Sequence, residues 1–122
     1  MDVPGFGPWS VKHAVVHVQP PREVLEAMLT VRLHLDECGE DNGPLRVVVG
    51  SQARGIIPPS QIECAVRDGW IRTCLVPRGG ALLMRPLLLH ASSPARRPTH
   101  RRVLHLEYAC GDLPHGLRWQ WS

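Results

Sequence analysis

A histidine and an arginine near the C-terminal end of the sequence have the types and spacing of a ligand-binding pair. His90 follows the apolar run Leu87–Leu89, and Arg101 comes eleven positions later, at the start of another apolar segment. A neutral imidazole can ligate a metal, and a guanidinium can bind a carboxylate through two parallel charge-assisted hydrogen bonds. The two residues are therefore candidates for a metal ligand and for the anchor of an acidic small molecule.

A second candidate cluster is His34-Leu-Asp36, the one His-x-Asp in the sequence. Residues 30–36 alternate between polar and apolar side chains, as a half-buried strand does, and side chains at i and i+2 share one face of a strand. Two histidines and one carboxylate form the metal site of non-haem Fe(II) oxygenases. His34, Asp36 and His90 could thus converge on one iron ion, although a solvated polar strand face explains the same pattern.

The elements that must position these residues are predicted to be short strands joined by turns. Asp41-Asn-Gly43 and Arg78-Gly-Gly80 are turn signals of the kind that separates strands. Two short helices, at 21–29 and 59–67, are each entered by proline. The pattern indicates a mainly β domain, a sandwich or barrel, with one or two short helices. The predicted strands are 29–36, 45–49, 71–76, 80–84, 86–91 and 102–109.

The N-terminal segment has no hydrophobic period. Residues 1–21 are rich in proline and glycine, and we expect them to form a loop that wraps over a single domain spanning residues 1–122. His13 and His17 are four positions apart, which on a helix would suit a metal. The neighbouring prolines and the β-branched pair Val15-Val16 argue against a helix there.

Composition narrows the class of protein. The chain has 122 residues, 43% of them hydrophobic, and a formal net charge of +3, which suits one globular domain and gives no support to nucleic-acid binding. No apolar run is long enough for a membrane span and no signal segment is visible, so a cytoplasmic protein is expected. The four cysteines show neither a CxxC nor a zinc-ligand spacing, and we expect them to be reduced.

Four stretches of the sequence together resemble the phytanoyl-CoA dioxygenase family, whose members are Fe(II)- and 2-oxoglutarate-dependent hydroxylases. They are Met28–Asp36, Glu40–Ser51, Gly80–Pro94 and Arg101–Tyr108. The resemblance implies a double-stranded β-helix, the cupin-like jelly roll. It also implies Fe(II) and 2-oxoglutarate as cofactors and hydroxylation of a small organic substrate.

The resemblance also implies roles for individual residues. His90 matches the distal iron ligand, and Arg101 matches the partner of the distal carboxylate of 2-oxoglutarate. Arg102 is the weaker choice for that partner, because neighbouring residues on a strand point to opposite faces. The segment His17–Pro21 resembles a loop near the active site, which makes His17 a candidate for substrate contact. No further catalytic residue is assigned.

Two departures from the family pattern bear on activity. The family's metal-binding His-x-Asp lies in a Trp-His-Gln-Asp-like motif that would fall just before Asp2, and the segment Leu33–Asp36 matches a later core strand instead. We therefore expect a chain truncated at its N-terminus, an incomplete jelly roll, and only weaker claims of His34 and Asp36 to iron. Val49-Gly-Ser-Gln52 stands where the family usually has Pro-Gly-Ser-His.

These departures leave two functional hypotheses. The first is an oxygenase whose catalysis is retained, impaired or lost. The second is a non-catalytic, degenerate jelly roll that binds a small acid or serves assembly. An incomplete sheet exposes unpaired backbone groups and apolar faces, which natural proteins usually cover by pairing. We therefore also expect a homodimer or a larger assembly.

Overall fold

The computed structural model describes residues 3–119 and is mainly β, as predicted. Eight strands lie within these residues, together with two α-helices and one short 3-10 helix, Ser51–Arg54. The helices are α1, Arg22–Glu26, and α2, Pro59–Asp68. The strands are β1 (Trp9–Lys12), β2 (Val15–Val18), β3 (Leu29–His34), β4 (Leu45–Val48), β5 (Ile71–Cys74), β6 (Ala81–Met84), β7 (His90–Ser92) and β8 (Val103–Tyr108).

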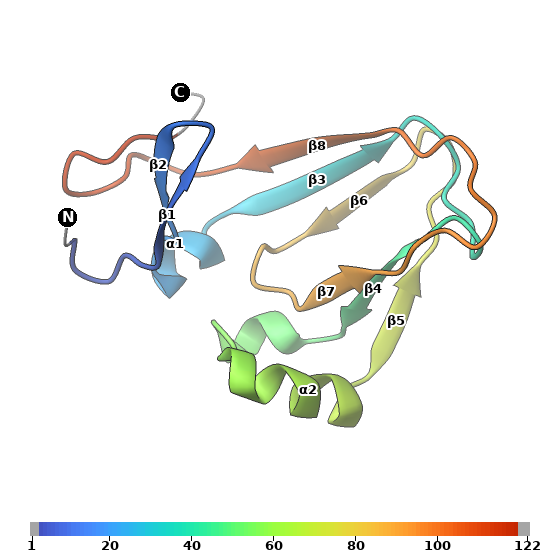
Figure 1. Cartoon of the computed structure of the whole chain (residues 1–122), viewed down its shortest axis with the longest axis horizontal. Helices are drawn as coiled ribbons and strands as arrows, with labels where there is room; N and C mark the ends of the chain where they lie inside the picture. Colours follow the sequence, from blue (N-terminus) through green and yellow to red (C-terminus); the bar gives the residue numbers. More distant parts are fainter. Residues whose placement is uncertain (1–2, 120–122) are drawn as a thin grey trace.

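Two antiparallel three-stranded sheets form the body of the domain, in the orders β6-β3-β8 and β5-β4-β7. Figure 1 shows them as two layers joined by connecting loops at the right of the view. The hydrophobic core lies between the layers, where Leu45 and Val47 of β4 cluster with Met84 of β6. Two facing antiparallel sheets with crossed connections are the arrangement of a jelly roll, and the fold agrees with the predicted jelly-roll class.

Pairing registers identify which residues point toward the core. Directly paired residues lie on the same face of a sheet. Thr30 pairs with the core residue Met84, so the set Thr30, Arg32 and His34 faces the space between the sheets. On the other sheet, the core residue Val47 pairs with Arg72 on one side and with His90 on the other. His34 and His90 therefore both belong to inward-facing sets.

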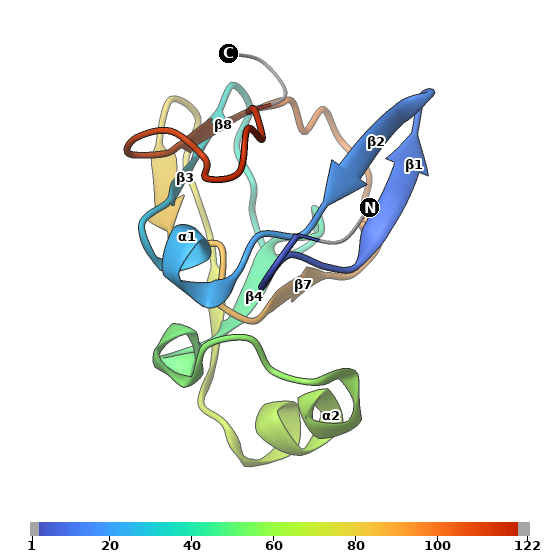
Figure 2. The ribbon, with the colours of Figure 1, turned by 90° about the vertical axis from the view of Figure 1, so that its left-hand side faces the viewer.

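The predicted N-terminal loop is replaced in the structure by a hairpin. β1 pairs with β2 in the register Val11 with Val16 and Lys12 with Val15, and Figure 2 shows the hairpin projecting from the body. The turn residues His13 and Ala14 have φ angles of 51° and 62°, a left-handed pair typical of two-residue hairpin turns. This turn is not predictable from the sequence, because neither residue is glycine or asparagine, the residues that usually indicate a two-residue hairpin turn.

The apolar run before His90 is a turn and not the predicted strand 86–91. Leu88 N–H donates to the Arg85 carbonyl at 3.0 Å, and β7 begins only at His90. Pro86 explains the difference, because proline offers no N–H to a ladder and fixes φ at a value that suits a turn. The three leucines thus carry the chain from β6 in one sheet to β7 in the other.

The helices are short. α1 is shorter than the predicted 21–29, whereas α2 agrees closely with the predicted 59–67, with Pro58 before it and Gly69 after it. Among residues 3–119, no helix has the length and apolar character needed to cross a membrane. The four cysteines are free, as expected.

Candidate functional site

His90 holds one ring nitrogen in a hydrogen bond and leaves the other available. Its Nδ1 lies 2.6 Å from the Leu88 carbonyl oxygen. A carbonyl oxygen can only accept, so Nδ1 carries the proton and Nε2 keeps its lone pair. This is the arrangement in which histidine commonly ligates a metal, with the second nitrogen fixed by a backbone carbonyl. The His90 side chain is exposed at the start of β7.

Ser51 anchors the backbone immediately before His90. Ser51 is 2% exposed, and its Oγ accepts a hydrogen bond of 2.8 Å from Leu89 N–H. The Leu89 carbonyl in turn accepts from Val48 N–H at 2.9 Å. The position of His90 therefore depends on a serine from the 3-10 helix. No role of Ser51 is predicted from the sequence, although its place after Gly50 in the family-like motif is a signal for one.

Arg101 lies just before β8, with its guanidinium against the Asn42-Gly43 turn. Its Nη1 donates to the Asn42 carbonyl at 3.1 Å and to the Gly43 carbonyl at 2.5 Å. Gly43 has φ of +60°, and a Cβ there would lie 2.5 Å from that same Nη1. The turn thus needs glycine both for its backbone conformation and for the close approach of Arg101.

The Asn42 side chain holds the loop that links His90 to Arg101. It is 6% exposed, its Oδ1 accepts from Thr99 N–H, and its Nδ2 donates to the His100 carbonyl, each at 3.4 Å. Asp41 adds an ion pair of 2.9 Å with Arg96 of the same loop. The predicted turn, residues 41–43, therefore also holds this loop in place, a role that no sequence pattern indicated.

Asp36 is not placed as a metal ligand. β3 ends at His34, so the expected shared face of His34 and Asp36 does not extend to position 36. The Asp36 carboxylate accepts from Arg102 Nε and Nη2, each at 2.9 Å, and from Arg102 N–H at 2.8 Å. Hydrogen bonds and charge from Arg102 hold the pKa of Asp36 well below its usual range. A carboxylate paired so completely has little capacity left for a metal.

His34 is buried and lacks partners. The residue is 4% exposed, and neither ring nitrogen has a hydrogen-bond partner. Burial, followed by the positive charges of Arg32 and Arg101, lowers the pKa of His34. The same two charges disfavour a cation beside this ring. Arg32 itself has a buried Nε without a partner.

The described residues do not supply a complete iron site. Within residues 3–119, no group of three histidine, cysteine, aspartate or glutamate side chains could hold a metal ion. The expected convergence of His34, Asp36 and His90 is therefore not present. His90 fits an iron ligand by its free Nε2, but a three-ligand facial site needs two more donors.

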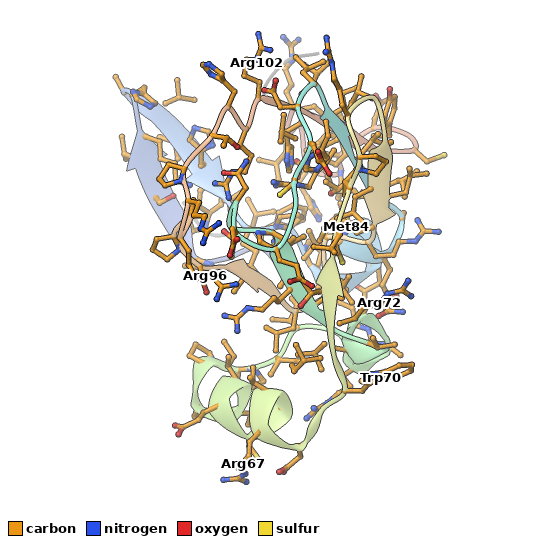
Figure 3. The ribbon with its side chains drawn as sticks, turned by 90° about the vertical axis from the view of Figure 1, so that its right-hand side faces the viewer. Arg67, Trp70, Arg72, Met84, Arg96 and Arg102 are labelled. Atoms are coloured by element: carbon orange, nitrogen blue, oxygen red, sulfur yellow. The ribbon has the colours of Figure 1, made fainter. Side chains whose placement is uncertain are left out.

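A cleft of about 730 Å³ opens between the two sheets on the side of β5 and β6. This volume is typical of small-molecule sites. Figure 3 shows Arg72 and Met84, two of the residues that line it. Val47 lines the cleft and pairs with His90 on the neighbouring strand. The cleft therefore extends to the cross-strand neighbour of His90. Apolar side chains of Val47, Leu82, Met84 and Leu88 are accompanied by Arg72, Arg85 and Gln52.

Within residues 3–119, the remaining histidines form no hydrogen bond with His90 or Arg101. His17 is half-buried on β2 and pairs with Ser10. His100 is exposed on the loop after β7. His105 pairs with Arg32 on the inward face of β8, but it is exposed and its Nε2 lies 3.3 Å from Glu107 Oε1.

Fold and site together define a class: a jelly-roll-like domain with one inward imidazole suited to metal and an arginine shortly after it. The comparison with protein families agrees, because the model of the phytanoyl-CoA dioxygenase family matches residues 3–103. The chain belongs to the phytanoyl-CoA dioxygenase family, whose members generally use Fe(II) and 2-oxoglutarate. No individual curated protein matches the sequence significantly.

Proposed function

We propose that this protein has an Fe(II)/2-oxoglutarate-dependent dioxygenase-type function and acts on a small organic substrate. Family membership supports the class of reaction. The observation that carries the assignment to particular residues is the hydrogen bond from His90 Nδ1 to the Leu88 carbonyl, which leaves Nε2 free to ligate. In this proposal His90 holds iron, Arg101 holds the distal carboxylate of 2-oxoglutarate, and iron and 2-oxoglutarate supply the oxidising chemistry.

The chain's own residues would contribute placement and exclusion of water. Ser51 and Val48 fix the backbone at Leu89 and thereby orient the His90 ring. Arg101 uses Nη1 for the Asn42 and Gly43 carbonyls, and its planar guanidinium has further N–H groups, on Nε and Nη2, with which it would bind the acid. His17 remains our candidate for substrate contact.

Catalysis requires donors beyond those in residues 3–119, which is why a second candidate function stands beside the first. The absence of a three-ligand group in these residues and the Asp36–Arg102 pairing favour a non-catalytic jelly roll that binds a small acid or serves assembly. The two functions differ in whether metal and acid meet at one site. Both keep Arg101 as the anchor of a carboxylate.

An anaerobic titration separates them. The purified chain is titrated with Fe(II) in the presence of 2-oxoglutarate, and the visible charge-transfer band of iron chelated by the acid is recorded. For a working site, we expect a band that His90→Ala abolishes and that His100→Ala, on the exposed loop, leaves in place. If no band forms at millimolar 2-oxoglutarate, the proposal of catalysis is wrong and the non-catalytic function stands.

The cleft supports a substrate with an apolar body. Its lining combines Leu82, Met84 and Leu88 with the charged Arg72. Cys74 also lines the cleft and offers a direct test, because a bound substrate would shield it from a maleimide. Exposed Cys64 is the control within the same molecule. A candidate substrate that leaves the labelling rate of Cys74 unchanged does not bind there.

We further propose that the chain self-associates. The outer face of the β6-β3-β8 sheet carries exposed apolar side chains, with Leu83 59%, Leu104 48% and Tyr108 56% exposed. Registers place all three on one face, and contiguous apolar faces of this kind usually pack against a partner. Light scattering at tens of micromolar should give at least a dimer mass, and Leu104→Gln should reduce it. A monodisperse monomer contradicts this proposal.

The free cysteines support a reducing compartment, and we propose the cytoplasm as the location. Fractionation of the source cells with an antibody against the chain tests this. Recovery in a membrane or extracellular fraction would count against it.

A further inference from the structure

The inward face of β3 carries buried polar atoms that the protein itself does not satisfy. Both ring nitrogens of His34 and the Nε of Arg32 are buried without a hydrogen-bond partner. Thr30, next along the same face, is 3% exposed. Buried polar groups in folded proteins are nearly always paired, and unpaired ones commonly mark a missing water, ion or ligand. Three such atoms on two neighbouring inward residues call for a specific occupant.

The charge around this face selects an anion. Arg32 shares the face with His34, and Arg101 lies two residues before Val103, which pairs directly with His34. The positive charges of both arginines act on the His34 ring. Two guanidinium groups beside a neutral imidazole present N–H donors and positive potential, which suit a carboxylate and repel a metal ion. A water molecule could satisfy single atoms but would not compensate the two charges. The occupant that meets both requirements is an acid.

We propose that Arg32 and His34, together with Arg101, bind a carboxylate group of a small organic acid between the two sheets. The Arg32 Nε–H and one ring N–H of His34 donate to the carboxylate oxygens, and Arg101 contributes positive charge from its position just before β8. This assignment deepens the proposed function, because the acid would be 2-oxoglutarate or an acidic substrate. It rests on that function only for the identity of the acid.

Binding to the metal-free protein tests the assignment without any oxygenase activity. The chain is treated with EDTA and titrated calorimetrically with glutarate, 2-oxoglutarate and acetate. Arg32→Gln should weaken binding at least about tenfold, since a charge-assisted hydrogen bond is lost. Arg67→Gln is the matched control, because Figure 3 shows Arg67 on α2, at the end of the molecule away from Arg102, and it should bind as the wild type does.

The three acids distinguish the source of the carboxylate. Tighter binding of glutarate and 2-oxoglutarate than of acetate assigns the site to a dicarboxylate such as the cosubstrate. Equal binding of acetate assigns it to the single carboxylate of a substrate. No binding of any acid at millimolar concentration, or equal affinity of the wild type and Arg32→Gln, overturns the proposal.

A second readout guards against a variant that fails to fold. In the wild-type protein, the ring ¹⁵N signals of His34 should move when glutarate is added, while those of His13, on the hairpin turn, should stay in place. Unchanged His34 signals overturn the proposal. Arg32→Lys keeps the charge but loses the planar donor geometry, so its affinity should lie between those of the wild type and Arg32→Gln. Because no iron is present, failure of the iron titration with His90 would not affect these results.

Discussion

Asp36 and Arg102 tie the end of β3 to the start of β8 through three hydrogen bonds. The Arg102 guanidinium donates twice to the Asp36 carboxylate, at 2.9 Å each, and the Arg102 backbone N–H donates once at 2.8 Å. The Asp36 side chain is 17% exposed, and that of Arg102 is 67% exposed. This pairing positions the neighbouring residue Arg101 and removes Asp36 from the set of available metal ligands.

The Asp36–Arg102 pair predicts a dependence of stability on acidic pH. The pKa of Asp36 is lowered in the folded state, so its contribution is complete above the ordinary aspartate value of about 4 and is lost as pH falls further. Asp36→Asn should lower Tm by a few degrees at pH 7, and the difference from wild type should shrink below pH 4. Thermal unfolding followed by circular dichroism measures both. Asp112→Asn, at an exposed position, is the control and should lower Tm little at either pH.

Gly43→Ala should lower the free energy of unfolding by more than backbone strain alone would. Ala at this position must adopt φ of +60° and meets Arg101 Nη1 and the Ser93 carbonyl oxygen, both at 2.5 Å. Gly79 has φ of +79° with nothing within 4 Å, so Gly79→Ala measures the strain without the contact. Strain costs about 1–2 kcal/mol, and Gly43→Ala should exceed Gly79→Ala by at least about 1 kcal/mol in urea unfolding. Equal losses would show that Arg101 does not depend on this approach.

Ser51 predicts a stability loss that also disturbs the candidate ligand. Ser51→Ala leaves the half-buried Leu89 N–H without its 2.8 Å acceptor, which should cost about 1 kcal/mol in urea unfolding. Ser10→Ala on the exposed β1 strand is the control. Because Leu89 precedes His90, the ring signals of His90 should also shift in Ser51→Ala. A stability loss below about 0.5 kcal/mol would mean that water replaces the serine.

Much of the fold follows from local sequence signals. Alternation predicted β3 and β8 to within two residues, and Pro58 and Gly69 marked both ends of α2. The hairpin β1–β2 was missed because left-handed His13 and Ala14 give no turn signal. The apolar run before β7 misled because hydrophobicity cannot distinguish a strand from a turn between sheets. Pro86 was the available evidence against the strand.

The candidate site was predictable only in part, because its contacts join distant segments. The motif resemblance led to His90 and Arg101, but the partners that position them come from elsewhere in the chain. Ser51 supports Leu89 from 38 positions away, and Asn42 reaches His100 across 58. The pairing of Asp36 with Arg102 spans 66 positions. Such contacts depend on the sheet registers, which a single sequence does not determine.

His34 predicts that stability decreases as pH falls below neutral. Its pKa is lowered in the folded state, so the ring is neutral in both states above the ordinary value of about 6.5. Below that value the unfolded chain takes up a proton that the folded chain resists, and the free energy of unfolding falls. The variant His34→Leu tests this in a buffer that contains no carboxylic acid. Its free energy of unfolding at pH 7.5 should equal that of the wild type or exceed it by about 1 kcal/mol, because an unpartnered polar group is removed. Between pH 7.5 and 5.5 it should lose less stability than the wild type, as measured by urea unfolding. His100→Leu, on the exposed loop, should keep the wild-type dependence of the free energy of unfolding on pH. If His34→Leu also keeps it, buried His34 is not the source of the pH dependence.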